Sequence, residues 1–233
     1  RQTDVAGNLS TSSQTLDFTV DSTTTKPTLT FVDTGSLGDN LTKNGTVTVA
    51  NIETGAKWEY SNDGSNWTTG SGFCVSLAVD GVLSFYVRAS DKAGYILCSD
   101  EFVFKFDATA ATPLLMLAND TGQNNVDLVT SSGVVNVSGL EDWTWQYSLN
   151  GGTWSTGTNS SLTISQIGTH TVIVKQTDAS ANVSANSVPL TFSLEGTPAA
   201  PTLGLSIDSN VGSDNITNKN EITVSGVVAA ASM

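Results

Sequence analysis

The sequence repeats itself at a fixed spacing, and this repeat constrains the fold more than any other feature. The segment Thr3–Asn8, Thr-Asp-Val-Ala-Gly-Asn, returns in altered form at Ser90–Tyr95 and at Thr177–Asn182, with successive copies 87 residues apart. The segment Trp58–Ser61 returns as Trp145–Ser148 at the same spacing. A repeat of this length is long enough to be a small domain with its own core. The sequence therefore predicts a tandem array of domains.

Three prolines mark the boundaries of the repeats. Pro27, Pro113 and Pro201 occupy equivalent positions, so residues 28–113 and 114–201 are interpreted as two complete repeats. Residues 1–27 are interpreted as the last strands of a preceding repeat, and residues 202–233 as the first part of a following one. Because the chain begins without Met and stops part-way through a repeat, we expect it to be a fragment of a longer protein.

Alternating apolar and polar residues predict strands in each repeat. In residues 28–113 the segments with this pattern are Leu29–Val32, Thr46–Val49, Trp58–Tyr60, Phe73–Leu77, Leu83–Val87 and Phe102–Phe106. An Asp63-Gly64 step after the third segment indicates a hairpin turn. No segment shows the sustained spacing of an amphipathic helix. About seven short strands in fewer than 90 residues predict an all-β fold of tandem immunoglobulin-like antiparallel β-sandwich domains.

Composition excludes several classes of function. The chain has 9 Lys and Arg against 22 Asp and Glu, for a net charge of −13, which argues against nucleic-acid binding. No apolar run approaches the roughly 20 residues that span a bilayer, so no membrane insertion is expected. No catalytic triad, phosphate loop or nucleotide-binding motif is present, and no enzymatic activity is expected. The single histidine, His170, lies in an alternating segment and is expected at the surface.

The tryptophans are assigned by whether they recur. Trp58 and Trp145 lie in the third predicted strand of their repeats and are expected to fill the core of each sandwich. A platform for stacking on sugars is the alternative. Trp67 and Trp154 also recur at the repeat spacing, which favours a structural role. Trp143 has no aromatic counterpart in the preceding repeat and is the better candidate for contact with a sugar.

Acidic residues recur at three kinds of position. The first kind lies six residues before each boundary proline and comprises Asp21, Asp107 and Glu195. The second kind lies in the loop after the first strand and comprises Asp33 and Asp39, with the counterparts Asp120 and Asp127, and Asp208 and Asp214. The third kind is the aspartate of the Thr-Asp-x-Ala-Gly-Asn loop and comprises Asp4, Asp91 and Asp178.

Immunoglobulin topology brings these positions to the junctions between repeats. Asp33, Asp39 and Asp107 are expected at the far end of residues 28–113, where Asp178 of the next repeat would meet them. Clustered carboxylates repel each other unless a cation lies among them, and oxygen donors suit Ca²⁺ better than Mg²⁺ or Zn²⁺. The predicted Ca²⁺ ligands are Asp21, Asp33, Asp39, Asp91, Asp107, Asp120, Asp127, Asp178 and Glu195. The alternative is that each aspartate only caps its own turn.

The two cysteines, Cys74 and Cys98, lie in the same repeat, and their counterparts are Ser161 and Ala185. An exported protein could join them in a disulfide. Two separate, small buried thiols are the alternative, and the sequence does not decide between them.

The repeat resembles a known family. The segments Asp33–Thr42, Trp58–Gly64 and Thr3–Asn8, with an aspartate before the boundary proline, resemble bacterial Ig-like repeats. Such repeats occur in giant RTX-type and biofilm-associated surface adhesins exported by type I secretion. The resemblance implies tandem extender domains on the outside of the bacterial cell, with Ca²⁺ at interdomain junctions. Tyr95, Ser180-Ala181 and Glu195 depart from the family pattern, and weaker or differently shaped ligation is expected there.

The sequence thus predicts a structural extender of a cell-surface adhesin, stiffened by Ca²⁺, that projects an adhesive tip. A carbohydrate- or peptide-binding module of the same kind of adhesin is the alternative. The expected partners are the neighbouring repeats of the same chain. A surface glycan or a protein ligand is left open.

Overall fold

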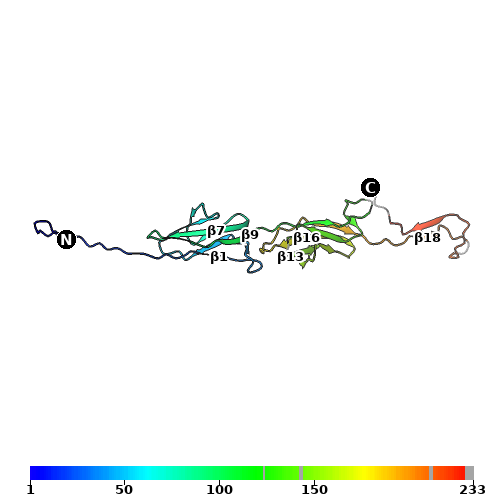
Figure 1. The fold of residues 1–233 in the computed structure, drawn as a ribbon. Coiled ribbons are helices and arrows are strands. Elements are labelled where there is room, and N and C mark those ends of the chain that lie inside the picture. The colour runs from blue at the N-terminus through cyan, green and yellow to red at the C-terminus, as the bar shows by residue number, and fades with distance from the viewer. Residues whose placement is uncertain (123, 142–143, 210–211, 229–233) are drawn as a thin grey trace. The chain divides into compact units, whose positions relative to one another are not determined.

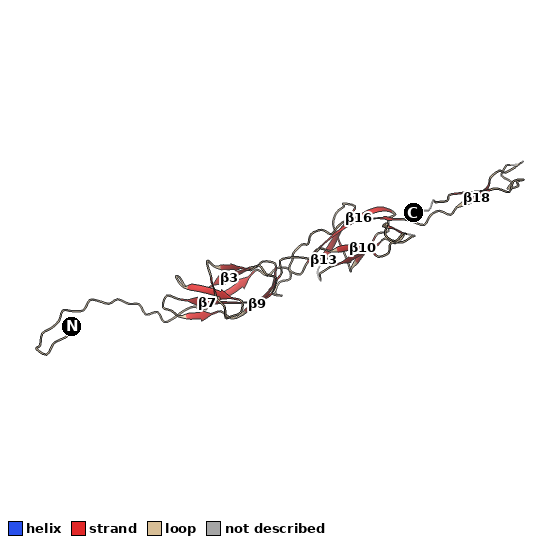
Figure 2. Ribbon diagram, turned by 90° about the horizontal axis from the view of Figure 1, so that it is seen from above, coloured by secondary structure: helices blue, strands red, loops and turns tan. Residues whose placement is uncertain are grey.

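The computed structural model describes residues 1–122, 124–141, 144–209 and 212–228, and its regular elements are all strands. Figure 2, in which strands are red, shows the arrangement without a helix. The described residues therefore hold no helix that could cross a membrane. Two compact units are present. The first unit comprises residues 1–109 with 179–182, and the second comprises residues 110–178 with those from Val183 onward.

The first unit contains a β-sandwich (Figure 1). Its smaller sheet has the order β1 (Thr28–Phe31), β3 (Thr46–Ala50), β6 (Cys74–Ser76). Its larger sheet has the order β2 (Leu41–Thr42), β9 (Phe102–Phe106), β7 (Gly81–Ser90), β4 (Lys57–Ser61), β5 (Thr68–Thr69), and β8 (Ile96–Cys98) also pairs with β7. All pairs are antiparallel except β2 with β9, which is parallel.

The second unit repeats this arrangement. Its smaller sheet has the order β10 (Leu114–Leu117), β12 (Val134–Ser138), β15 (Ser161–Thr163). Its larger sheet has the order β11 (Val129–Thr130), β17 (Leu190–Leu194), β16 (Gly168–Thr177), β13 (Thr144–Leu149), β14 (Ser155–Thr156). A separate antiparallel pair follows, β18 (Thr202–Leu205) with β19 (Ile222–Ser225).

The predicted all-β class and sandwich architecture are confirmed. Each of the six segments that the alternation predicted overlaps a strand of the first unit. The sequence missed β2, β5 and β8, because segments of two or three residues are too short to show alternation. The parallel pairing of β2 with β9 also joins residues far apart in the sequence, which local patterns do not reveal.

The predicted core tryptophans are confirmed. Trp58 and Trp145 are each 6% exposed, and each indole Nε1 donates a hydrogen bond to a backbone carbonyl. Each ring lies directly against a glycine, Gly70 in one sandwich and Gly157 in the other. A Cβ on either glycine would come within 2.3 Å of the ring, so these positions leave no room for a side chain.

The other recurrent tryptophans pack against cations on the outer face of the larger sheets. Arg88 lies 4.4 Å from the ring centroid of Trp67, and Lys175 lies 4.3 Å from that of Trp154. These rings therefore take part in a repeated cation–π contact. Trp143, the candidate for a sugar contact, lies outside the described residues.

His170 is buried, so the expectation of a surface side chain was wrong. It is 3% exposed in β16, where its Nε2 is 2.6 Å from the Gln166 carbonyl and its Nδ1 is 3.2 Å from the Asn150 amide. Strand side chains alternate between faces, and His170 shares the inward face with Val172 and Val174. The alternation of this segment therefore indicated that His170 is buried.

The cysteines are free, exposed thiols in β6 and β8. Val75 points into the core, so its neighbour Cys74 points outward from the smaller sheet. Cys98 belongs to the opposite sheet. Neither the disulfide nor the pair of buried thiols that the sequence left open is present in the structure.

The predicted hairpin turn after β4 is confirmed, and Asp63 organises it. Its carboxylate accepts the backbone N–H groups of Ser65 and Asn66, at 2.8 and 2.7 Å, and the Ser61 hydroxyl at 2.9 Å. The Asn66 side-chain amide donates to the other oxygen at 2.6 Å. These bonds, led by the Asn66 backbone N–H, hold the pKa of Asp63 well below its ordinary value.

The substitution Asp63→Asn tests this turn. A depressed folded pKa means that the ionised form stabilises the fold above the unfolded pKa, and that this stabilisation is lost as pH falls through the folded pKa. We therefore expect the variant to melt below wild type at pH 7, and the gap to shrink as pH falls below 3.8, the ordinary value. Melting curves from pH 7 to pH 2 measure this, with the exposed Asp17→Asn as control. A gap that stays constant with pH would contradict the argument.

Candidate metal centre

The strand alternation of β7 carries a carboxylate to the edge of the core. Phe85, Val87 and Ala89 face inward, and Asp91 continues this face one step beyond the strand, where it is 8% exposed. Asp91 Oδ1 accepts the Tyr95 backbone N–H at 2.8 Å. Asp91 Oδ2 is buried and has no hydrogen-bond partner. A buried polar atom without a partner is costly, so this oxygen needs an explanation.

Two further carboxylates lie beside Asp91. One oxygen from each of Asp21, Glu53 and Asp91 lies within 4.8 Å of the others. Asp21 lies in the segment before β1, Glu53 lies between β3 and β4, and Asp91 lies between β7 and β8. Across the described ranges this is the one group of three or more acidic, histidine or cysteine side chains brought this close.

The segment that leads into β1, residues 21–27 (the incoming segment), is attached to the sandwich beside this group. The Thr25 N–H donates to Glu53 Oε1 at 2.7 Å, and the Thr25 hydroxyl donates to the Asn51 carbonyl at 2.8 Å. Thus Glu53 both belongs to the acidic group and holds the backbone of the incoming segment. The position of Asp21 depends on this attachment.

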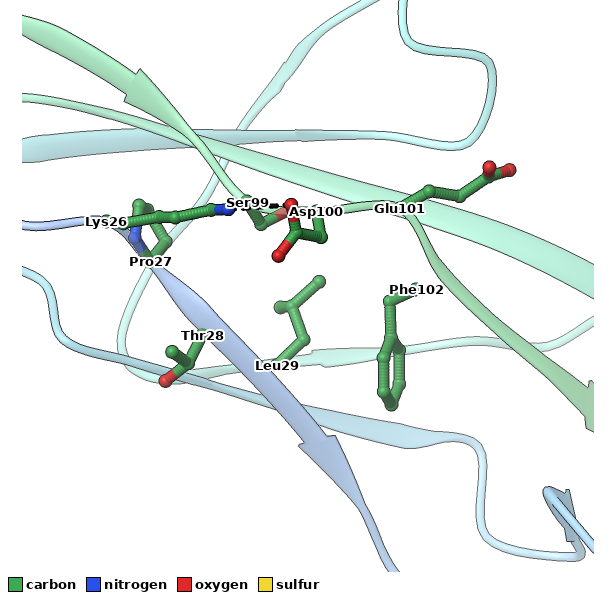
Figure 3. A pocket seen from close by; sticks show the side chains of 8 residues that line it. All are labelled: Lys26, Pro27, Thr28, Leu29, Ser99, Asp100, Glu101 and Phe102. Carbon is green, nitrogen blue, oxygen red and sulfur yellow. Dashed lines mark hydrogen bonds and ion pairs between the residues drawn. The ribbon is translucent and has the colours of Figure 1, made fainter.

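A pocket lies further along the incoming segment (Figure 3). Lys26 reaches Asp100 at 2.6 Å over a pocket of about 250 Å³, whose walls include Leu29 and Phe102. Both charged side chains are largely exposed, and such ion pairs contribute little to stability. The volume is below the range of about 300–1,000 Å³ for ligand sites. This pocket is therefore a weaker candidate than the acidic group.

The donor set of the acidic group fits a hard divalent cation. Three carboxylates within 4.8 Å of one another repel each other, and a cation among them would remove this repulsion. All three offer oxygen, which Ca²⁺ takes in a flexible shell of about six to eight ligands. Neither a thiol nor an imidazole belongs to the group, as zinc would favour. The unpaired Asp91 Oδ2 is the oxygen with the most to gain from an ion.

The acids of the loop after the first strand show a recurrent geometry. Oδ2 of the first acid accepts a backbone N–H across the loop, in the pairs Asp33–Gly38, Asp120–Leu128 and Asp208–Ser213. Oδ1 of each of these first acids is buried without a partner. The second acids, Asp39 and Asp127, accept the N–H two residues on, which is the geometry of turn formers. Metal binding by these loops stays a prediction.

Asp107 lies beside the first of these loops. Its N–H donates to the Thr42 carbonyl at 2.9 Å. Residues 179–182, which belong to the same unit, contact this end. The Thr34 hydroxyl donates to the Ser180 carbonyl, and Asn182 Nδ2 donates to the Asp107 carbonyl, both at 2.8 Å. Within the described residues of this unit, the carboxylates of Asp33, Asp39 and Asp107 do not form a close group of three.

The predicted acids of the second unit occupy matching positions. Asp178 follows β16 on the inward face and is 2% exposed. Glu195 follows β17, is exposed, and accepts the Ser193 hydroxyl at 2.9 Å. Their roles as ligands stay predictions.

Sequence reasoning missed Glu53. Its counterpart Glu141 accepts the Ala111 N–H at 3.0 Å, just as Glu53 accepts that of Thr25. Both accepted amides lie two residues before a boundary proline. Glu53 follows β3 and Glu141 follows β12 at the same distance along the chain. This recurrence was the signal that would have revealed Glu53.

Gln176 was also missed. It is 1% exposed, and its Nε2 donates to the carbonyls of Ala111 and Gly139, at 2.7 and 2.9 Å. Its Oε1 accepts the Glu141 N–H at 2.6 Å. In the first unit the equivalent residue is Ala89, because Ala89 pairs with Trp58 as Gln176 pairs with Trp145. Both repeats thus hold the leading segment by a glutamate, and only the second adds the contacts of a buried glutamine.

No protein-family model and no curated protein matches this sequence. Among solved structures, fibronectin(III)-like modules of Clostridium thermocellum CbhA are 12% identical with a TM-score of 0.36, over 72% of this chain and 94% of that one. The BSP domain of a biofilm-associated protein is 13% identical with a TM-score of 0.27, over 74% of this chain and 30% of that one. A tetra-tandem repeat from the extending region of a large adhesion protein is 18% identical with a TM-score of 0.29, over 78% and 52%. The chain thus spans less than two thirds of the biofilm-associated protein domain and of the tetra-tandem repeat. Likenesses this distant say nothing about function.

The substitution Asp91→Asn tests the acidic group. With Ca²⁺ present, we expect wild type to melt at a higher temperature than in chelator, and the variant to lose this difference because one of three carboxylates is gone. In chelator the variant should melt no lower than wild type, because a repulsive charge has been removed. Calorimetry measures both effects. Asp4→Asn is the matched control, since both Asp4 oxygens already accept hydrogen bonds. An equal response of Asp91→Asn and wild type to Ca²⁺ would exclude Asp91 as a ligand.

Proposed function

We propose that this chain is part of the extender region of a bacterial surface adhesin, whose Ig-like repeats are stiffened by Ca²⁺ at their junctions. The proposal places the protein outside the cell, as the resemblance to RTX-type and biofilm-associated adhesins implies. Tandem sandwiches with matching strand order and core support a repetitive, structural role.

The observation that carries the proposal is the unpaired Asp91 Oδ2 within the group of Asp21, Glu53 and Asp91. A buried carboxylate oxygen is normally hydrogen-bonded, and carboxylates this close normally have a counter-charge. A Ca²⁺ ion would supply that charge and link the three chain segments. The net charge of −13 would raise the local concentration of cations around the chain.

The residues around the group give it a mechanical consequence. Asp21 lies in the incoming segment, whereas Glu53 and Asp91 lie in loops of the sandwich that follows. Holding Asp21 against these loops would restrict the swing of residues 21–27, whose Ser and Thr content otherwise favours a flexible linker. Thr25 and Glu53 already fix one point of this segment. A second fixed point at Asp21 would define its direction as well.

Removal of calcium from the 233-residue chain tests the proposal. Extracellular calcium modules bind at about 10⁻⁴–10⁻³ M, so millimolar Ca²⁺ against a chelator is the right comparison. Ca²⁺ at about 10 mM is roughly 10 to 100 times this dissociation constant, so the ion would stabilise the fold by about 1.4–2.7 kcal/mol for an independent site. We expect chelation to lower the melting temperature and to change the maximum dimension in small-angle scattering. The triple variant D21N/E53Q/D91N should lose the thermal response that depends on this group.

Two controls make this experiment sharper. Mg²⁺ at the same concentration separates a calcium site from general screening of charge, because Mg²⁺ demands tighter octahedral geometry. The variant Asp17→Asn removes an exposed acid from the same N-terminal segment. If chelation changes neither the melting temperature nor the maximum dimension, the stiffened extender is wrong.

A groove beside Glu53 favours the alternative, a carbohydrate-binding module. The groove has a volume of about 740 Å³, and Gly70, Gly72 and Phe73 line it. Phe73 is 71% exposed, and an exposed ring can stack on a sugar face. In the next repeat Ser160 stands in its place. If this function is correct, wild type should retain a glycan on an array and Phe73→Ala should not, with Phe18→Ala as the control for an exposed ring elsewhere.

A further inference from the structure

Two copies of the repeated aspartate loop in the first unit differ in how they satisfy their carboxylate. In the first copy, Asp4 Oδ1 accepts the N–H groups of Ala6 and Asn8, at 3.0 and 2.9 Å. Asp4 Oδ2 accepts the side-chain amide of Asn8 at 2.9 Å. The hydrogen bond from the Asn8 side chain is also the main reason that the pKa of Asp4 is lowered. Both Asp4 oxygens therefore have partners within their own loop.

The second copy lacks the side-chain donor. Tyr95 occupies the position of Asn8, and its backbone N–H still donates to Asp91 Oδ1 at 2.8 Å. The Tyr95 side chain has no amide group, and the residue is 47% exposed. Asp91 Oδ2, the counterpart of the oxygen that Asn8 satisfies, is buried without a hydrogen-bond partner. One substitution within the repeat thus accounts for the unpaired oxygen.

The same oxygen belongs to the carboxylate that lies beside Asp21 and Glu53. Asp4 has no such neighbours among the described acidic groups. The copy without the internal donor is therefore the copy with carboxylate neighbours. An amide N–H and a metal ion would compete for the lone pairs of this oxygen, because both are attracted to the same negative charge.

We propose that Tyr95 sets the calcium affinity of the group formed by Asp21, Glu53 and Asp91, by withholding the asparagine amide that would otherwise occupy Asp91 Oδ2. Tyr95 acts here as a positioning residue, through Asp91, and does not itself contact the ion. From the resemblance to bacterial Ig-like repeats, weaker or differently shaped ligation was expected at Tyr95, whereas the proposal is that Tyr95 strengthens it. This inference rests on the proposed calcium site.

The test restores the donor. In Tyr95→Asn, the new amide is expected to reach Asp91 Oδ2 as Asn8 reaches Asp4. Losing one charge-assisted contact to a competitor should weaken calcium binding by about five- to tenfold. Calorimetric titration measures the affinity, with Asp91→Asn as the reference in which the site is removed. Tyr95→Phe and Tyr95→Ser lack an amide and should bind within about twofold of wild type on the same physical argument.

A second readout does not depend on calcium. In chelator, Tyr95→Asn should melt at a higher temperature than Tyr95→Ser, because the amide satisfies the buried oxygen. Hydrogen exchange of the backbone amides in residues 91–95 should likewise be slower in Tyr95→Asn than in Tyr95→Ser. A merely structural role of the tyrosine ring predicts instead that Tyr95→Asn and Tyr95→Ser lose stability equally, while Tyr95→Phe, which keeps the ring, does not.

The outcomes separate this inference from the proposed function. If wild type shows no calcium response, the proposed site is wrong and this inference falls with it. If wild type binds calcium and Tyr95→Asn binds as tightly, the site stands and the role of Tyr95 is overturned. Equal weakening in Tyr95→Asn, Tyr95→Phe and Tyr95→Ser would also overturn it, since only the first of these carries the amide.

Discussion

In one long strand of each sandwich, β7 or β16, side chains alternate between the two faces with a period of two residues. This alternation decides which of the strand's residues enter the core and where a buried carboxylate lies. In β7 it buries Phe85, Val87 and Ala89 against the opposite sheet. Because the same period continues past the strand, Asp91 is drawn to the inward side and loses most of its contact with water. Strand β16 does the same with Asp178. A carboxylate is thus buried at the end of each core by the packing of the apolar residues that precede it.

The buried carboxylate of Asp91 matters both for the stability of the fold and for the proposed binding of Ca²⁺. In two other turns the acid has both oxygens satisfied by local amides, as Asp4 and Asp63 show. Asp91 is satisfied on one oxygen only, and its neighbours Asp21 and Glu53 add negative charge. Hydrogen bonding and electrostatics therefore both favour a cation at the place where the incoming segment meets the sandwich. The other repeat holds its leading segment by the equivalent acid, Glu141, and adds a neutral side chain, Gln176, where the first repeat has Ala89.

Parts of the fold and the site were predictable because they depend on local patterns. Alternation located six strands of the first sandwich, and recurrence identified Trp58 and Trp145 as core residues. Recurrence also marked Asp21 and Asp91 as acids of one junction, and the structure brings both into one group. Glu53 recurs as Glu141, but as a single acid in a loop without a surrounding motif. Strand β2 has two residues, too few to show alternation, and its parallel partner β9 is about sixty residues away along the chain. His170 was misplaced because its polarity was given more weight than its position in the alternation.

The sequence by itself determined the all-β class and most of the apolar residues that face each core, because these follow from the two-residue period of a strand. Only the tertiary structure decided which acids meet and which oxygens are left without a donor. The meeting of Asp21, Glu53 and Asp91 requires three segments that are distant in sequence to arrive at one end of a sandwich. Whether an oxygen is buried and unpaired depends on the burial and the hydrogen bonds around it, which no single segment of the chain specifies.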